Sequence, residues 1–429
     1  MPAGTIYALS SGNPPAAIAV VRISGPEASG ALASLAGRLP KPRRACLVGL
    51  RHPSTGELLD NALVLFFPSP GSATGEDTAE LHLHGGRSVV RALLAALAEM
   101  PGLREAQPGE FTRRAFENGR IDLAEAEGLA DLLLAETESQ RRAALALAGG
   151  ALSRAVEAWQ NSLLTIAARL EAALDFADEG DVEEEQSLVD VAALKRLIEE
   201  IQAILDRPGT ERLRDGVRVV IAGPPNTGKS SLLNWLAGRQ AAITSAVAGT
   251  TRDLVEAPTA ISGTAFLLTD TAGLRDSGDE VEAIGVERAR ETLAAADLIL
   301  WLGEPQDCPA RSRAITVRSM ADLQIDPPSP DVDVSVSSET GEGMNELVHL
   351  LITRSRALLP LDGEVAINLR HRAALSDCLS HLRDVESSDD PVLVSESLRQ
   401  ARIALDSITG RAGVEDMLDA LFGRFCIGK

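Results

Sequence analysis

A glycine-rich segment near the middle of the chain has the residues and spacing of a phosphate-binding loop. Gly223-Pro-Pro-Asn-Thr-Gly-Lys229-Ser230 fits the pattern G-x-x-x-x-G-K-[ST], with a strand-like apolar run before it and a helix-like run after it. In such a loop, backbone N–H groups and the start of the following helix surround phosphate oxygens. We therefore expect Lys229 to contact the β- and γ-phosphates of a nucleotide and Ser230 to bind Mg²⁺.

Two downstream segments complete the pattern of a switch-type GTPase. Gly249-Thr-Thr251-Arg-Asp carries a threonine that could be the second magnesium ligand and sense the γ-phosphate. Asp270-Thr-Ala-Gly273 follows an apolar strand-like run, so Asp270 would hold the magnesium shell and the Gly273 N–H would face the γ-phosphate. A P-loop kinase or ATPase is not expected to carry all three segments in this order.

Water activation and base recognition depart from the commonest GTPase patterns. Leu274 stands where a glutamine would orient the attacking water, so Glu282 is one candidate for that role; a solvated loop residue is the alternative. Ser319-Met-Ala-Asp322 stands where Asn-Lys-x-Asp is usual. Asp322 can still accept hydrogen bonds from guanine, but we expect both the affinity and the specificity for the base to be weakened. Ser337 belongs to the last loop near the base.

The elements that must position these residues divide the chain into four segments. Residues 1–118 predict mixed α and β structure, with strands over residues 16–23, 63–67 and 79–84. Residues 119–214 and 358–429 have apolar residues at helical spacing, and we expect helices there that include residues 189–206 and 370–385. Residues 215–357 carry the nucleotide motifs among alternating strands and helices. We expect a multidomain protein in which a Ras-like P-loop GTPase domain is inserted into a discontinuous helical domain, after an N-terminal α+β domain.

Composition limits the possible classes of protein. Of 429 residues, 45% are hydrophobic and 24% are charged, which excludes a mainly disordered chain. The formal charge of −21 excludes a uniformly basic nucleic-acid binder but leaves a local basic face open. Four separated cysteines form no metal-binding spacing, and no apolar run is long enough to span a membrane. We expect a cytoplasmic location and no membrane partner.

The chain resembles the tRNA-modifying GTPase family MnmE, also called TrmE, over nearly its whole length. The likeness rests on the opening Ile18-Ala-Val-Val-Arg22-Ile-Ser-Gly-Pro, on Thr74-Gly-Glu-Asp-Thr-Ala-Glu80, on the stretch from Pro108 through Arg120, and on the terminal Cys426-Ile-Gly-Lys429. The resemblance implies that residues 1–118 have a folate-binding fold through which the chain forms a homodimer.

The resemblance also implies a reaction. Such a protein is a K⁺-dependent GTPase that works with an FAD-dependent partner of the MnmG type, in a heterotetramer. Together they add an aminomethyl or carboxymethylaminomethyl group to C5 of the wobble uridine of certain tRNAs. The one-carbon unit comes from a tetrahydrofolate derivative, either 5-formyl or methylene. Two alternatives remain: a nucleotide-dependent scaffold with weak GTPase activity, which the altered base motif favours, and a ribosome-assembly GTPase.

Site residues follow from the motifs and, for K⁺ and folate, from the resemblance alone. The residues expected around GTP are Asn226, Thr227, Gly228, Lys229, Ser230, Ser231, Ser245, Thr250, Thr251, Asp270, Gly273, Asp322 and Ser337. The resemblance implies K⁺ ligands at Asn226, Ser245, Val247 and Thr250, and a folate pocket lined by Arg22, Glu80, Arg120 and Lys429. It also matches Glu282 to the family's water-orienting glutamate and gives Cys426 a possible thiol role.

Two side-chain groups have competing interpretations. His82 and His84 alternate on one strand face and could bind a metal, although structural roles are favoured because no third ligand is in view. Arg113, Arg114 and Arg120 could form a local cationic cluster for tRNA, although arginine-rich helix faces are commonly only solvated.

Overall fold

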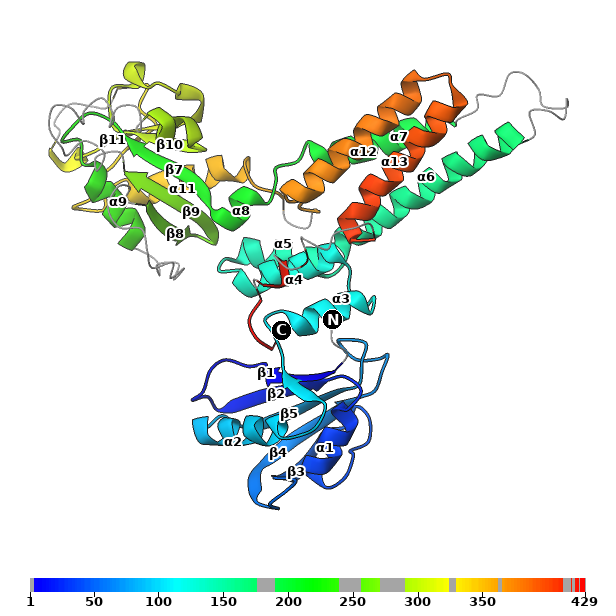
Figure 1. Cartoon of the computed structure of the whole chain (residues 1–429). Coiled ribbons are helices and arrows are strands. Elements are labelled where there is room, and N and C mark those ends of the chain that lie inside the picture. Colours follow the sequence, from blue (N-terminus) through cyan, green and yellow to red (C-terminus); the bar gives the residue numbers. More distant parts are fainter. Residues whose placement is uncertain are drawn as a thin grey trace, which may run out of the picture. The chain divides into compact units, whose positions relative to one another are not determined.

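The computed structural model describes residues 4–175, 190–238, 256–270, 290–323, 329–361, 365–411, 418, 421–423 and 425–428. The chain forms two compact units, Met1–Ala130 with Asp406–Lys429 and Asp131–Leu405. Each unit is described by itself below, and the labels follow Figure 1. Most of the acidic stretch after Asp175 lies outside the described residues.

The first unit is built on a six-stranded mixed sheet with the order β3-β4-β5-β2-β1-β6. Its strands are β1 (Thr5–Leu9), β2 (Ile18–Ser24), β3 (Cys46–Arg51), β4 (Leu58–Phe67), β5 (Thr78–His84) and β6 (Leu103–Glu105). All neighbours are antiparallel except β1 and β6. The predicted strands around residues 16–23, 63–67 and 79–84 are confirmed, with ends shifted by a few residues.

Alternating residues of this sheet face two different environments. Val21, Ile23 and Leu81 pack in one apolar cluster with residues of α1 (Ala28–Ala36) and α2 (Arg87–Ala98). Because side chains alternate along a strand, Arg22 and Glu80 point to the opposite face. Ile6 and Ala8 pack there against Phe111 of α3 (Glu110–Glu117).

The C-terminal segment completes the first unit. Phe422 and Phe425 pack with residues of α4 (Leu123–Leu134), including Leu123. Two glycines allow the close approach of this segment: a Cβ at Gly109 would lie 2.2 Å from the Phe422 carbonyl oxygen, and one at Gly428 would lie 2.2 Å from the carbonyl oxygen of Leu9. The terminal signature is therefore attached to the end of β1.

Long helices form one part of the second unit. They are α5 (Glu138–Ala148), α6 (Ala151–Asp175), α7 (Val191–Leu205), α12 (Leu369–Ser387) and α13 (Pro391–Thr409). Helix α7 buries Leu194, Leu197 and Ile201 at helical spacing and packs on α12. The Trp159 indole donates to Glu200 Oε2 at 3.1 Å and joins α6 to α7. None of the described helices is long and apolar enough to cross a lipid bilayer.

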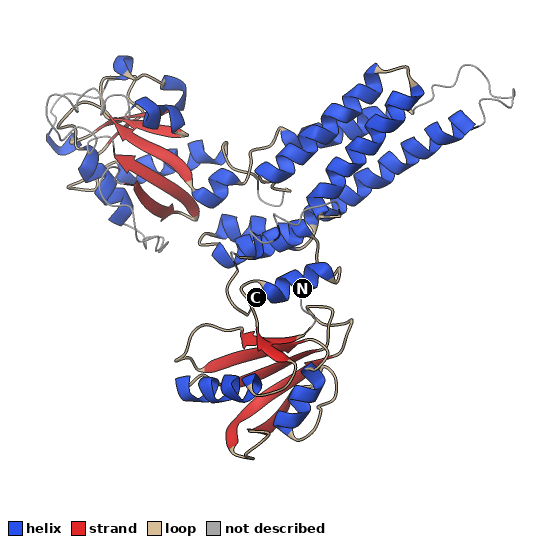
Figure 2. Cartoon of the chain, in the orientation of Figure 1, coloured by secondary structure: helices blue, strands red, loops and turns tan. Residues whose placement is uncertain are grey.

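The other part of the second unit is a six-stranded sheet with the order β12-β11-β10-β7-β9-β8, in which only β8 is antiparallel. Figure 2 draws the strands of the chain in red and its helices in blue. Its strands are β7 (Val217–Ala222), β8 (Glu256–Ile261), β9 (Thr264–Asp270), β10 (Leu298–Trp301), β11 (Ala314–Arg318) and β12 (Val334–Ser335). Helix α9 (Lys229–Gly238) follows β7, helix α11 (Met344–Arg356) follows β12, and the short α8 (Glu211–Asp215) precedes β7. Two short 3₁₀ turns, Pro305–Asp307 and Arg311–Arg313, lie in the connection from β10 to β11.

Candidate functional site

The predicted phosphate-binding loop connects β7 to α9 at the carboxyl edge of the parallel strands. Gly223 has a φ of +150°, and a Cβ there would lie 2.9 Å from the carbonyl carbon of Leu302. Asn226 and Gly228 also have positive φ values, of +61° and +83°. Left-handed backbone is available mainly to glycine and asparagine, so this loop needs these residue types to turn toward the helix.

The lysine of the loop pattern is buried. Lys229 is 7% exposed, and its Nζ donates to the Pro224 carbonyl at 2.6 Å. The ammonium group is thus directed into the loop that would surround phosphate oxygens. Thr227 Oγ1 donates to the same carbonyl at 3.0 Å, which fixes the bend of the loop.

Two side-chain oxygens of the kind that bind magnesium, from Ser230 and Asp270, lie together at the end of β9. Strands β7 and β9 are parallel with Ile221 opposite Asp270, which brings the end of β9 beside the start of α9. Ser230 Oγ donates to Asp270 Oδ2 at 2.6 Å, and Asp270 is only 4% exposed. A hydroxyl and a carboxylate are hard oxygen donors, so the pair fits Mg²⁺ held together with nucleotide phosphates.

The segment Ser319–Asp322, which we call the base loop because it stands where the guanine-binding motif is usual, forms a hydrogen bond with the phosphate-binding loop. Ser319 Oγ donates to the Thr227 carbonyl at 2.5 Å, and the methyl end of Met320 lies 3.4 Å from where a Cβ of Gly228 would stand. Met320 itself has a φ of +57°. Asp322 lies in the short 3₁₀ turn Ala321–Leu323 that follows. A cavity of about 490 Å³ adjoins both loops.

Ser337 lies in the loop that follows β12. Its side chain is buried, and its Oγ accepts from the Thr340 N–H at 3.1 Å. The Ala321 N–H donates to the Val336 carbonyl at 3.0 Å, so the loops carrying Asp322 and Ser337 are linked through the backbone. The structure therefore brings the described part of the predicted nucleotide set to one edge of the sheet.

Several predicted site residues lie outside the described residues. They are Ser245, Val247, Thr250, Thr251, Gly273, Glu282 and Lys429. The second magnesium ligand, most of the implied K⁺ ligands and the water-orienting glutamate accordingly stay predictions. Ser231 is described and lies in the first turn of α9.

The N-terminal candidates form an ion pair on the sheet face opposite α1 and α2. Arg22 is directly opposite Glu80 in the β2–β5 register, and Arg22 Nη2 lies 2.8 Å from Glu80 Oε1. The Arg22 guanidinium also lies over the Phe111 ring, with Cζ 5.8 Å from its centroid. Both charged side chains are about one-fifth exposed, which leaves them accessible to a polar ligand.

The two strand histidines have separate carboxylate partners. His82 Nε2 lies 3.5 Å from Glu80 Oε2, whereas His84 Nδ1 lies 2.8 Å from Asp60 Oδ1. Across the described ranges, no group of three His, Cys, Asp or Glu side chains is placed to hold a metal ion.

Arg120 and Cys426 belong to the same unit as that ion pair. Arg120 is exposed, and its Cγ would lie 3.2 Å from a Cβ at Gly75, within the Thr74–Asp77 loop. Cys426 is exposed, two residues before Gly428, which contacts the end of β1. Strand β1 pairs with β2 along the register that includes Arg22, so the C-terminal segment lies close to the N-terminal candidates.

The predicted cationic cluster of Arg113, Arg114 and Arg120 is wrong for Arg114. This arginine is 8% exposed, and its guanidinium pairs with Glu76 at 3.0 Å and with Glu110 at 3.1 Å. Arg113 pairs with Glu117 at 3.0 Å. Buried and neutralised in this way, Arg114 is not available for phosphates.

The network around Arg114 is a feature that sequence reasoning missed. Burial alone would raise the pKa of Glu110, but hydrogen bonds from Arg104 and from the Gln107 N–H, with the charges of Arg104 and Arg114, outweigh it and lower that pKa. Glu110 and Arg114 are four residues apart on one helix, a spacing that could have indicated their pairing.

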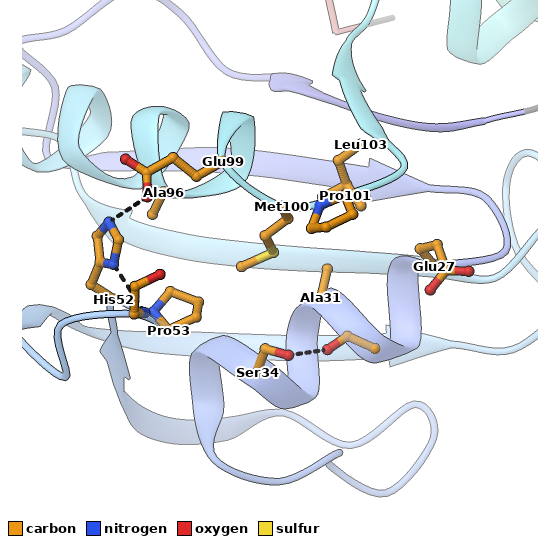
Figure 3. A pocket seen from close by; sticks show the side chains of 12 residues that line it. Glu27, Ala31, Ser34, His52, Pro53, Ala96, Glu99, Met100, Pro101 and Leu103 are labelled. Atoms are coloured by element: carbon orange, nitrogen blue, oxygen red, sulfur yellow. Dashed lines mark hydrogen bonds and ion pairs between the residues drawn. The ribbon is translucent and has the colours of Figure 1, made fainter.

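The first unit has a cavity between α1 and α2 (Figure 3). It measures about 420 Å³ and includes His52, which pairs with Glu99 at 3.5 Å. Ala31 and Ala96 line it from the two helices. This cavity is therefore on the helix-covered side of the sheet, whereas Arg22 and Glu80 point to the other side.

Comparison with known proteins gives matches along the whole chain. A family model described as the GTP-binding protein TrmE N-terminus matches residues 5–120, and one described as the MnmE helical domain matches residues 123–426. A tRNA modification GTPase MnmE of Rhizorhabdus wittichii is 59% identical, covering 99% of this chain and 96% of that protein. Proteins with the same name from Novosphingobium aromaticivorans and Erythrobacter litoralis are each 54% identical over 99% of this chain.

Proposed function

Because the chain belongs to the tRNA modification GTPase MnmE family, we propose that it couples K⁺-dependent GTP hydrolysis to modification of the wobble uridine of certain tRNAs. The family is one of GTP hydrolases, and its G-domain motifs are present here. We propose Mg²⁺, K⁺, a tetrahydrofolate derivative and an FAD-dependent partner as the further components of the reaction. The contact between Ser230 and Asp270 is the observation that carries it, since it unites two separate motifs into one Mg²⁺-type site.

The nucleotide chemistry is supported by the loop between β7 and α9. Lys229 would neutralise charge that develops on the β- and γ-phosphates, and Mg²⁺ bound at Ser230 would bridge them. Thr251 would add the second protein ligand from outside the described residues. Asn226 would contribute to a K⁺ site with Ser245, Val247 and Thr250, where a cation stabilises transition-state charge. Glu282 would orient the attacking water.

Base recognition rests on Asp322, whose carboxylate would accept hydrogen bonds from N1 and N2 of guanine. Ser319 and Met320 replace an asparagine and a lysine there, yet Ser319 still ties the base loop to the phosphate-binding loop. We propose that guanine selectivity is retained while overall affinity for the nucleotide is reduced.

A tetrahydrofolate derivative fits the open face of the N-terminal sheet. Arg22 and Arg120 supply positive charge for a glutamate tail, and Glu80 supplies an acceptor for a polar pterin ring. Lys429 would extend the positive side, and Cys426 would lie nearby as a candidate thiol. Exposed Leu47 and partly exposed Leu63 on the same face support dimerisation through these sheets. The FAD-dependent partner, a cytoplasmic location and a heterotetramer complete the proposal.

The proposal is tested by reconstitution. The purified chain, its FAD-dependent partner, GTP, K⁺, unmodified tRNA and a tetrahydrofolate labelled in its one-carbon unit are incubated, and the digested nucleosides are analysed by mass spectrometry. We expect label in a modified wobble uridine. Arg22→Ala should abolish labelling while leaving GTP hydrolysis intact, and Lys229→Ala should abolish both. Hydrolysis of GTP without any labelled nucleoside in the unaltered protein would contradict the proposal.

One observation favours a second candidate, a nucleotide-dependent scaffold with weak GTPase activity. The base loop lacks the asparagine and lysine that usually hold guanine. On that reading, Lys229→Ala would leave tRNA modification unchanged as long as the partner stays bound. The same reconstitution experiment therefore separates the two candidates.

A further inference from the structure

One segment of the first unit has a charge opposite to that of the whole chain. The chain has 62 acidic and 41 basic side chains, yet residues 28–56 contain no aspartate or glutamate. Four of the cations in this stretch fall within residues 38–44, which connect α1 to β3 and which we call the basic loop. Its cations are Arg38, Lys41, Arg43 and Arg44, and all four are exposed.

The basic loop has a fixed turn at its centre. The Arg44 N–H donates to the Lys41 carbonyl at 3.2 Å, with Pro42 and Arg43 between them. Arg43 has a φ of +58°, in the turn position that glycine favours. Left-handed backbone is strained for an arginine, so other contacts must hold Arg43 in this conformation.

Those contacts attach the turn to the end of β4. The Arg43 N–H donates to the Phe66 carbonyl at 2.8 Å, and the guanidinium lies over the Phe67 ring with Cζ 5.8 Å from its centroid. The guanidinium also donates to the Gly71 carbonyl. Arg43 is therefore the structural member of the basic loop, and Lys41 and Arg44 are held on either side of its turn.

Within the part of the chain that the structure describes, Arg38, Lys41 and Arg44 form no ion pair with a carboxylate. Exposed arginines of the helical part behave differently: Arg141 lies 2.7 Å from Glu138, and Arg399 lies 2.7 Å from Glu396. An unpaired cluster of this kind concentrates positive potential on a protein that is otherwise strongly negative.

The basic loop is connected to the proposed folate pocket. Gly71, which Arg43 contacts, belongs to the connection between β4 and β5. The same connection continues to Thr74, whose carbonyl accepts from Asn118 at 2.8 Å, and to Gly75, which packs against Arg120. Its two carboxylates are already engaged, because Asp77 accepts from the Ser69 N–H and Glu76 pairs with Arg114.

We propose that the basic loop contacts phosphates of the tRNA backbone and places the RNA beside the N-terminal pocket. This inference rests on the proposed function, which supplies the RNA. Cationic side chains on phosphates position a nucleic acid without reading its sequence, so the loop would serve every tRNA substrate alike. Each contact made by Arg38, Lys41 and Arg44 releases condensed counterions, which makes binding depend on salt.

The test compares two triple variants of equal charge in the full chain with its partner. Arg38→Gln/Lys41→Gln/Arg44→Gln removes the unpaired cations but keeps the anchoring arginine. The control, Arg141→Gln/Arg142→Gln/Arg399→Gln, removes three arginines that are paired with carboxylates of their own helices. Binding of fluorescent tRNA is measured by anisotropy from about 50 to 200 mM salt, a range in which phosphate contacts dominate affinity changes.

We expect the basic-loop variant to bind tRNA at least about tenfold more weakly at the lower salt concentrations, with a salt slope smaller by about 2. The control and GTP hydrolysis without tRNA should stay unchanged. Equal affinity and slope for the basic-loop variant and the unaltered protein would overturn the inference. So would a loss of binding to phosphatidylserine vesicles, or to an acidic protein, with tRNA binding retained. Failure of the unaltered complex to bind tRNA would contradict the proposed function itself.

Discussion

At the scale of single residues, burial decides how the four cysteines differ. Cys378 is fully buried, and burial raises the pKa of its thiol to about 12. Cys426 is exposed in the terminal signature, and Cys46 and Cys308 are partly exposed. Because the thiolate is the reactive form, the folded protein should direct alkylation away from Cys378.

We predict that iodoacetamide at pH 8 labels Cys426 first and leaves Cys378 unlabelled until the protein is unfolded. Peptide mass spectrometry at successive times measures both sites in one experiment. Labelling of Cys378 at the rate of Cys426 in the native protein would contradict the buried position of that thiol.

Glu110 gives a pH-dependent prediction at the same scale. Its lowered pKa means that the group stabilises the fold above the pKa it has when unfolded, and that this contribution is lost as the pH falls through the folded value. Glu110→Gln should therefore destabilise the region of α3 by about 3 kcal/mol near pH 7, since it breaks a buried pair. The difference from the unaltered protein should shrink as the pH drops below about 4.

Hydrogen exchange of peptides from α3 and β5 measures this effect locally. The matched control is Glu117→Gln, whose exposed pair with Arg113 should contribute less than about 1 kcal/mol. Equal protection of α3 in both variants would show that the network of Glu110, Arg114 and Glu76 does not hold this part of the unit together.

At the scale of elements, docking of the C-terminal segment depends on Gly109. Its φ is +70°, and a Cβ there would collide with the Phe422 carbonyl oxygen. Gly109→Ala should therefore displace the segment that carries Phe422 and Phe425, and raise proteolysis and hydrogen exchange in residues 421–428. Gly119→Ala is the control, because Gly119 has a φ of +63° but no atom within 4 Å of its Cβ position. The control should bear only a backbone cost of about 1 kcal/mol. Equal exchange in the two variants would contradict the docking.

Elements were also the level at which the sequence was most informative. The apolar runs that end at glycine or proline predicted β2, β4, β5 and β7, and apolar spacing predicted α7 and α12, because local patterns decide those elements. The buried position of Arg114 could not be predicted. Its partner Glu76 is 38 residues away, and only the folded sheet brings the two together.

The same limit applies to the candidate site. The motif pattern predicted that Ser230 and Asp270 lie together, because parallel strands end at one edge of a sheet, and the hydrogen bond between the two side chains confirms that placement. The hydrogen bond from Ser319 to Thr227 and the left-handed backbone of Met320 could not be predicted from the sequence, because the usual Asn-Lys pair is absent. Their geometry depends on tertiary contacts between β11 and the phosphate-binding loop.

At the scale of the whole molecule, one chain carries the GTPase motifs, the helical domain and the N-terminal domain of the family. The family relationship covers 99% of the chain, so the GTPase motifs and the N-terminal domain belong to one protein of that family. With a net charge of −21, cationic contacts with an RNA would have to be local, so we propose the exposed basic loop for them and not the buried Arg114.

The most direct measurement is GTP hydrolysis by the purified full chain in K⁺ and in Na⁺, with Glu282→Ala and Lys229→Ala beside the unaltered protein. We predict that K⁺ stimulates hydrolysis. In Glu282→Ala the rate of hydrolysis should fall by about a hundredfold or more, as expected for a residue that orients or activates the attacking water. Lys229→Ala should be inactive in both salts. Equal rates in K⁺ and Na⁺, or full activity of Glu282→Ala, would contradict the K⁺-dependent mechanism.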